Sequence, residues 1–355
     1  MCSLASWSVK VGKTGFLGFI IVISIAAQAQ DDSVSIKPVP VLTGSVAYFT
    51  RVTGGQYQDA PSISPLLLLP LGDKWLIEAK GSDSDTYAKN TLGDYAGTNS
   101  YGMSYAQIDY IANRYMTLVG GRFTTPFNIY GERLAPNWIR ALQGSPLTSS
   151  ETSGSALGGM VRGGIAGNDT FNFNYAVYFS SNNTNHIVAT DRSTGSRISF
   201  FLPKQRLEIG GSFQQVLQAD RAHASGAFLE WQPNHAPLTI RSEFARTSGT
   251  KGTGYWVEGT YRLSQISALR RLELVGRGQQ FFAADNLSAA TIKKLGTLGQ
   301  NVQEGDGGLN YYLTSDVRAS ASYGRQFIVN KDTNLWTVGM TYRFVMPMWP
   351  GGAAR

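Results

Sequence analysis

Cysteine is almost absent from this sequence of 355 residues, since Cys2 is the only one. One cysteine excludes an internal disulfide and a thiolate metal cluster. Histidine is nearly as rare, at positions 186, 223 and 235. No Gly-x-Ser-x-Gly elbow and no His-Glu-x-x-His zinc helix occurs, and residues 83–85 (DSD) begin like a calcium loop without its later ligands. The sequence therefore predicts no catalytic residue, no metal site and no cofactor.

Charged residues are also scarce, at 15% of the chain, where roughly a quarter is usual for soluble proteins. The net charge is +7, but the basic residues are spread along the chain and form no block. Nucleic-acid binding, which needs a concentrated basic surface, is therefore not expected. In place of charge the chain has 40 glycines and 12% aromatic residues. This composition is typical of short strands in a lipid-facing sheet.

A long hydrophobic run occurs only once, at residues 15–26 (GFLGFIIVISIA). It follows Lys10 and Lys13 and precedes Ala27-Gln28-Ala29, which fits a small-x-small cleavage site. The run has about a dozen residues, short of the roughly 20 that span a bilayer as a helix. We therefore predict a cleavable export signal at 1–29 rather than an anchor. The mature chain is then either soluble or a closed barrel, which satisfies its backbone within lipid.

The dominant pattern has a period of two residues. In residues 335–344, alternate positions carry Trp, Val, Met, Tyr and Phe, and the positions between them are mostly small or polar. Residues 171–179 (FNFNYAVYF) repeat the pattern, which indicates strands with one apolar and one wet face. The candidate strands are 43–52, 62–70, 74–83, 102–112, 114–125, 153–164, 170–181, 195–203, 205–216, 222–232, 236–248, 251–263, 268–281, 301–313, 315–328 and 333–344.

The connections between these strands alternate in length. Every second connection is a short turn, and the four longest gaps, at 84–101, 126–152, 182–194 and 282–300, all belong to the other set. Transmembrane barrels have short turns on one side and longer loops on the other. We therefore predict an all-β fold: an antiparallel transmembrane β-barrel of about 16 strands over 43–344, with a long third outward loop. A 30–42 segment and a 345–355 tail would both be periplasmic.

Residues 121–127 (GRFTTPF) and 131–133 (GER) resemble the strand-and-loop stretch of the phosphate-selective porin family and related sixteen-strand porins. The likeness covers about thirty residues and the overall architecture. It implies a third loop that folds into the barrel and narrows it. The last strand, closing on Phe344, also resembles the signal read by the barrel-assembly machinery. We expect the pore constriction at Arg122, Arg133, Arg140 and Glu132, with Arg122 pointing inward.

Charged residues at inward positions of the other strands are expected to line the lumen. Arginine leads among them, which favours a mild preference for anions. The alternative is that Arg206 with Glu208, and similar pairs two residues apart, only stiffen the wall. Aromatic residues at inward positions are few, so a sugar-stacking slide is not favoured. The predicted lumen wall comprises Lys80, Arg162, Arg206, Arg241, Arg262, Arg271, Arg277, Arg318 and Arg343.

Together these features predict a porin of the bacterial outer membrane, with passive diffusion of small hydrophilic solutes or ions through a water-filled channel. Its partners would be outer-membrane lipid, lipopolysaccharide, small solutes or anions, and the barrel-assembly machinery. A homotrimer is implied by the resemblance. Two alternatives remain: a structural or adhesive barrel with a blocked lumen, and, less favoured, an envelope hydrolase.

Overall fold

The computed structural model describes residues 39–348, apart from the segments 90–92, 150–153, 168–169, 184–190, 219–220, 249–251, 285–287, 289–291, 293–297 and 330. The predicted export signal, most of the predicted 30–42 segment and residues 349–355 lie outside this part of the chain. None of the described helices is long and apolar enough to cross a membrane.

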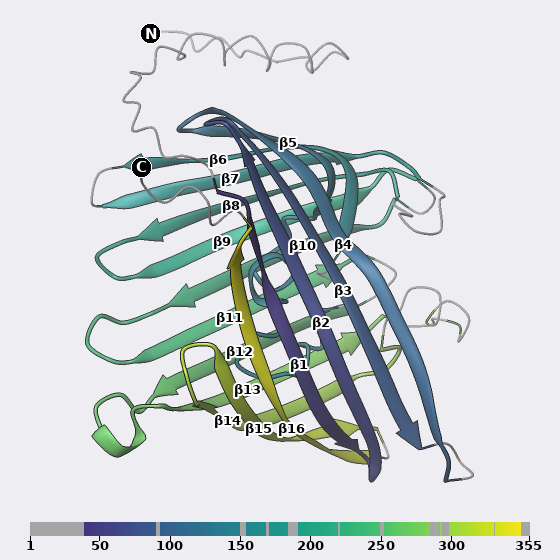
Figure 1. The fold of residues 1–355 in the computed structure, drawn as a ribbon. Helices are drawn as coiled ribbons and strands as arrows, with labels where there is room; N and C mark the ends of the chain where they lie inside the picture. The colour runs from purple at the N-terminus through teal and green to yellow at the C-terminus, as the bar shows by residue number, and fades with distance from the viewer. Residues whose placement is uncertain are drawn as a thin grey trace, which may run out of the picture. The chain divides into compact units, whose positions relative to one another are not determined.

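Sixteen antiparallel strands form one closed barrel, in which each strand pairs with its neighbours in sequence and β1 pairs with β16 (Figure 1). The predicted strand number and closure are therefore confirmed. The strands are β1 (Val41–Thr53), β2 (Gln56–Leu71), β3 (Trp75–Lys89), β4 (Tyr95–Asn113), β5 (Met116–Thr124), β6 (Ser155–Gly167), β7 (Phe171–Ser180), β8 (Ser193–Leu202), β9 (Leu207–Val216), β10 (His223–Trp231), β11 (Leu238–Thr247), β12 (Gly252–Arg262), β13 (Leu272–Ala283), β14 (Val302–Tyr312), β15 (Val317–Ile328) and β16 (Lys331–Pro347).

The period of two residues sorts the side chains between the two sides of the wall. Large apolar residues such as Tyr48, Val177 and Met340 are about half exposed on the outer side. Polar residues of the alternate positions, such as Glu243 and Thr341, are buried on the inner side. An apolar outside and a polar inside are what a barrel in lipid requires.

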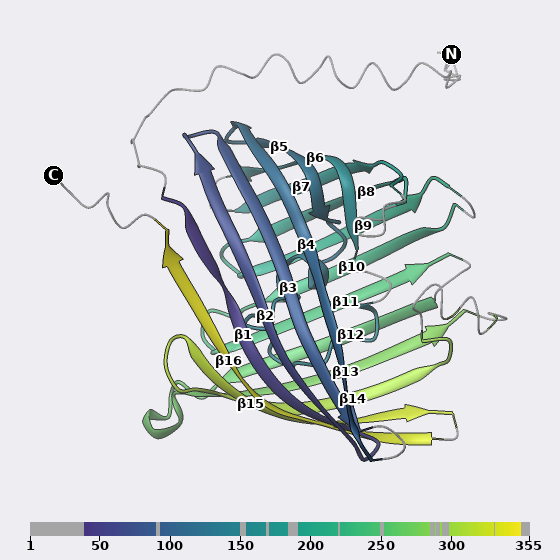
Figure 2. The ribbon, with the colours of Figure 1, turned by 45° about the vertical axis from the view of Figure 1, so that its right-hand side comes forward.

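Two predicted boundaries are wrong. The predicted loop 84–101 is mostly strand, because the β3–β4 ladder continues from Gly81↔Met103 to Lys89↔Tyr95. The predicted tail 345–355 also begins inside a strand, because barrel closure pairs Val41 with Pro347. Both errors have one cause: pairing with a neighbouring strand extends strands through residues that lack clear alternation. Figure 2 shows the long strands β1 to β4 running steeply past the flatter strands on the other side of the barrel.

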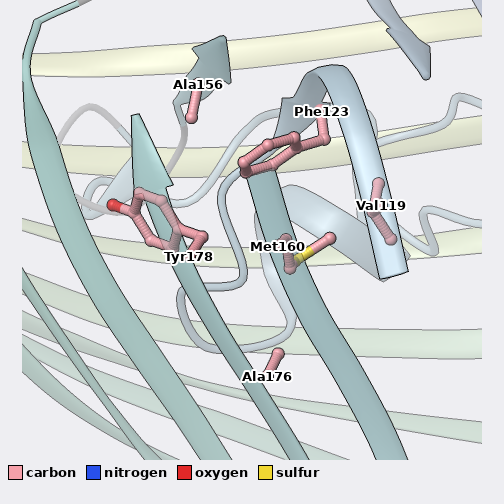
Figure 3. Packing of buried hydrophobic residues seen from close by; sticks show 6 residues of the cluster. All are labelled: Val119, Phe123, Ala156, Met160, Ala176 and Tyr178. Atoms are coloured by element: carbon pink, nitrogen blue, oxygen red, sulfur yellow. The ribbon is translucent and has the colours of Figure 1, made fainter. Parts of the chain in front are cut away.

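The inner wall of β5, β6 and β7 carries an apolar cluster where the chain is about to leave the wall. Phe123 meets Tyr178 edge-on, with ring centroids 5.9 Å apart (Figure 3). All members of the cluster are at least nine-tenths buried. The cluster fixes which side of β5 faces inward, one residue before that strand ends. Its members are Val119, Phe123, Ala156, Met160, Ala176 and Tyr178.

Candidate pore constriction

The described part of the segment between β5 and β6, residues 125–149 and 154, folds into the barrel rather than outward. Its first anchor is Asn128, whose backbone N–H donates to Ser212 Oγ of β9 at 2.9 Å. The Asn128 side-chain amide donates to the Phe244 carbonyl of β11 at 3.1 Å. These partners lie on strands far from β5 in the barrel, so the segment, called the inner loop below, crosses the lumen at once.

Glu243 of β11 is the second anchor. Its fully buried carboxylate accepts hydrogen bonds from the backbone N–H groups of Ile129 at 2.7 Å and Tyr130 at 2.5 Å. It also accepts one from Trp256 Nε1 at 3.1 Å. A buried carboxylate is tolerated only when such donors surround it. The loop covers Phe228 and Trp256 with Ile129, Tyr130 and Leu134, so these two inner-wall aromatics do not line open lumen.

Two ion pairs hold the next turn of the loop, a π-helix at Tyr130–Leu134. Arg133 makes a bidentate pair with Glu208 of β9, at 2.6 and 2.9 Å. Glu132 pairs with Arg197 of β8, whose guanidinium also donates to the Asn128 carbonyl at 3.1 Å. The predicted constriction residues Arg133 and Glu132 therefore anchor the loop, and Arg197 is a partner that the sequence did not reveal.

The second half of the loop follows the opposite wall. Asn137 Nδ2 donates to Ser62 Oγ of β2 at 3.2 Å, and Arg318 of β15 donates to the Asn137 carbonyl at 2.7 Å. Further along, Asn310 of β14 donates to the Ala141 carbonyl at 3.0 Å, and Arg277 of β13 donates to the Gly144 carbonyl at 2.9 Å. The inner loop is thus tied to both sides of the barrel and narrows it.

A cavity of about 270 Å³ remains between the inner loop and the wall formed by β1 to β4. The loop contributes Glu132, Pro136 and Trp138, and the wall contributes Lys80 and Tyr105. Arg343 of β16 also lines the space. We call this space the central compartment.

Three cations interact electrostatically around the inner loop, and one of them, Lys80, lines the central compartment. Arg51 has the inward register of Phe49 on β1, Lys80 lies on β3, and Arg140 is in the loop. Arg140 acts electrostatically on both Arg51 and Lys80. Arg140 donates to the carbonyl oxygens of Ala135 and Gln143, at 2.6 and 3.3 Å. Within the described part of the chain, none of the three cations forms a salt bridge.

The prediction that Arg122 points inward is wrong. Arg122 pairs across the sheet with Ala106 and Leu157, in the same row as the exposed Leu118. Its guanidinium donates to Ser155 Oγ at 3.1 Å, a residue of the same outer row. The prediction fails because it places Phe123, the apolar neighbour, on the lipid side. The apolar cluster of Figure 3 instead buries Phe123 on the inner side.

Four of the nine predicted wall cations take part in ion pairs, and one of these, Arg343, pairs with Asp316 at the barrel rim. Arg241 pairs with Glu230 at 3.3 Å and Arg277 with Asp306 at 3.1 Å, in both cases between adjacent strands. Arg162 of β6 pairs with Asp109 of β4, across the intervening strand β5. The expected ladders of residues two apart on one strand are replaced by cross-strand pairs, because opposite residues of adjacent strands are closer. Arg206 is misplaced by the prediction, since it lies in the exposed turn before β9. Arg318 contacts the loop, and Arg262, Arg271 and Arg343 line one mouth of the lumen.

One serine–histidine contact was not predicted. Ser248 Oγ lies 3.0 Å from His223 Nδ1 at the exposed end of the β10–β11 hairpin. The same two residues also make a backbone hydrogen bond, with Ser248 N donating to the His223 carbonyl at 2.8 Å. The backbone bond continues the hairpin ladder by one residue pair and brings the two side chains together.

No protein-family model and no curated protein matches this chain. Solved structures do match over most of its length. Salmonella typhi OmpF in complex with daunomycin aligns with a TM-score of 0.58 and 12% identity, over 86% of this chain and 97% of that one. Pseudomonas putida OprB aligns at 0.55 and 7%, over 86% and 92%. The anion-selective porin from Comamonas acidovorans aligns at 0.55 and 10%, over 87% and 100%. The chain therefore has the fold of the sixteen-strand outer-membrane porins.

Proposed function

We propose that this protein is a porin of the bacterial outer membrane through which small hydrophilic solutes diffuse passively, with a preference for anions. The closed wall, apolar outside and polar inside, supports insertion in lipid. The central compartment supports an open lumen rather than a blocked one, because the inner loop leaves about 270 Å³ unfilled. Export by the 1–29 leader, insertion by the assembly machinery, contact with lipopolysaccharide and a homotrimer belong to the same proposal.

The observation that carries the anion preference is the group of Arg51, Lys80 and Arg140. Cations with carboxylate partners present little net field, whereas these three have none among the described residues. A narrow aqueous passage with low-dielectric walls focuses such a field. Anions are then concentrated in the passage and cations are excluded from it. The Comamonas protein, described as an anion-selective porin, adds an analogy from a barrel of the same fold.

The test is the reversal potential of the purified protein in a planar bilayer across a potassium chloride gradient. We expect discrete conductance steps and a reversal potential whose sign shows that chloride is more permeant than potassium. A unit charge at close range in water contributes about 1 kcal/mol, so Lys80→Glu, a change of two charges, should lower the chloride-to-potassium permeability ratio by roughly tenfold or more.

Lys331→Glu is the matched control, because Lys331 is exposed at the start of β16 and lies outside the compartment. It should leave the permeability ratio unchanged. A bilayer that stays silent, together with liposomes that do not swell in permeant solutes, would refute diffusion and favour the structural or adhesive alternative. A conducting but cation-selective protein would refute the anion preference alone.

A further inference from the structure

A second space lies beside Trp138 of the inner loop, at the barrel rim where β1 begins and β16 ends. Its volume is about 470 Å³. We propose that this exit compartment is a binding site for a small oxyanion with two negative charges, held by Arg262, Arg271 and Arg343. The proposal rests on the proposed function, because the ligand would be a solute in transit.

The two compartments meet at only two of the described residues. Trp138 of the inner loop and Arg343 of β16 line both spaces. The Trp138 ring is held in place by two guanidinium groups, with Arg343 at 5.2 Å and Arg318 at 5.5 Å from its centroid. Such contacts fix an aromatic ring. Trp138 therefore forms the partition, and a solute that passes it meets Arg343 on both sides.

The exit compartment has more positive than negative charge. Arg343 forms a salt bridge with Asp316, in which Arg343 Nη2 and Asp316 Oδ1 are 2.8 Å apart. Arg262 and Arg271 form no salt bridge with any carboxylate of the described chain. Glu273 lies opposite Arg262 in the β12–β13 ladder, but its oxygens face Asn310 and the Tyr312 hydroxyl. Both guanidinium groups are thus without a salt-bridge partner and available to an anion.

The guanidinium groups of Arg262 and Arg271 are held in place by contacts with neighbouring residues. Arg262 Nε donates to the Arg270 carbonyl at 3.4 Å, and the group lies 4.6 Å over the Tyr312 ring. Arg271 Nη1 donates to the Leu313 carbonyl at 3.1 Å. Each group uses one nitrogen for this hydrogen bond, so its other N–H donors stay available. Guanidinium forks bind carboxylate, sulfate and phosphate oxygens in pairs, which gives geometric specificity as well as affinity.

The size of the compartment suits a small organic or inorganic anion with some of its water. Ligand sites commonly measure about 300–1,000 Å³, and this space falls at the lower end. Thr314 and Ser315 complete the lining with hydroxyl groups. Thr314 Oγ1 accepts from the backbone N–H groups of Asp316 and Val317, at 3.1 and 3.0 Å, so its own proton can be donated to a ligand.

The experiment is block of the chloride current by a dianion in single-channel recordings, with sodium succinate and sodium sulfate as probes. Each is added to one side of the bilayer and then to the other. We expect saturable block that is stronger from one side, because the exit compartment lies at one mouth. In the double variant R262A/R271A, the half-blocking concentration should rise about tenfold or more for each charge-assisted hydrogen bond that is removed. Block by both probes indicates that the site recognises the double charge. Block by one probe alone indicates that the site also recognises the shape of that anion.

Arg114→Ala is the matched control, because Arg114 is an exposed arginine in a turn at the same rim and lies outside the compartment. The half-blocking concentrations of both probes should be the same in Arg114→Ala as in the wild type. Heat-modifiable mobility on a denaturing gel shows that each variant has folded as a barrel. Block that is absent in the wild type, or that survives in R262A/R271A, would overturn the exit compartment and leave the conducting pore intact. A wild type that never conducts would overturn the proposed function itself.

Discussion

Removing the Glu243 carboxylate should loosen the inner loop. In Glu243→Ala the backbone N–H groups of Ile129 and Tyr130 and the indole N–H of Trp256 lose the acceptor they share. A buried donor left without a partner costs about 1–3 kcal/mol, so the three together cost on the order of 3 to 6 kcal/mol, because water entering the lumen relieves part of the loss. The next turn is still held by two ion pairs, Arg133 with Glu208 and Arg197 with Glu132. The loop should therefore fluctuate within the lumen rather than move out of it.

Glu243→Gln should have a smaller effect. An amide oxygen can still accept from the two backbone N–H groups, but its NH₂ group then faces the Trp256 indole N–H, and two donors cannot bond each other. We therefore expect a graded series in single-channel recordings, with open-channel noise and mean conductance rising from wild type through Glu243→Gln to Glu243→Ala. Thermal unfolding of the barrel should shift downward in the same order.

Glu230→Ala is the matched control, since Glu230 is a wall carboxylate that bonds Arg241 of β11 and Gln232 rather than the loop. It should leave the open-channel noise unchanged. Quiet channels in Glu243→Ala, with wild-type conductance, would refute the idea that this carboxylate holds the loop across the lumen.

Two further predictions concern the mouth and the wall. Hydrogen bonding from Arg343 holds the pKa of the exposed Asp316 below its ordinary value. The pair therefore persists from neutral pH down through the unfolded-state pKa of about 3.9, and it is lost only as pH falls through the lower native value. The chloride-to-potassium permeability ratio should rise only as pH falls through that lowered native pKa, and Asp316→Asn should show the raised ratio already at neutral pH; a ratio that Asp316→Asn does not change contradicts this. Gly163→Ala should impair barrel assembly, judged by heat-modifiable mobility, because the new methyl group collides with the Tyr115 carbonyl. Gly259→Ala, where a methyl group meets nothing within 4 Å, should assemble normally.

The fold class follows from the amino-acid sequence alone. Alternation such as that of residues 171–179 is local, and a strand with one apolar and one polar face has few uses other than a wall between lipid and water. The number of strands and the place of the long third connection follow from the same pattern. The extension of β3 and β4 into the predicted loop 84–101 does not, because residues such as Gly97 and Asn99 are strand only through their partners on β3.

The site could be predicted in part. The sequence points to the long loop and to Arg140, whose role in a constriction stays a prediction. It does not point to Arg51, because nothing near Arg51 in sequence marks it as a neighbour of the loop. Arg122 was assigned to the lumen from the apolar character of its neighbour Phe123, an assumption that fails where the inner wall is itself apolar.

The path of the inner loop, in contrast, is set by tertiary contacts. It depends on the bond of Asn128 to Phe244, 116 residues apart in sequence, and on the three donors around Glu243. A local pattern sets which face of a strand is polar, but it carries no information about which distant residue that face will meet. The grouping of Arg51, Lys80 and Arg140, and the meeting of two compartments at Trp138, therefore exist only once the barrel has closed around the loop.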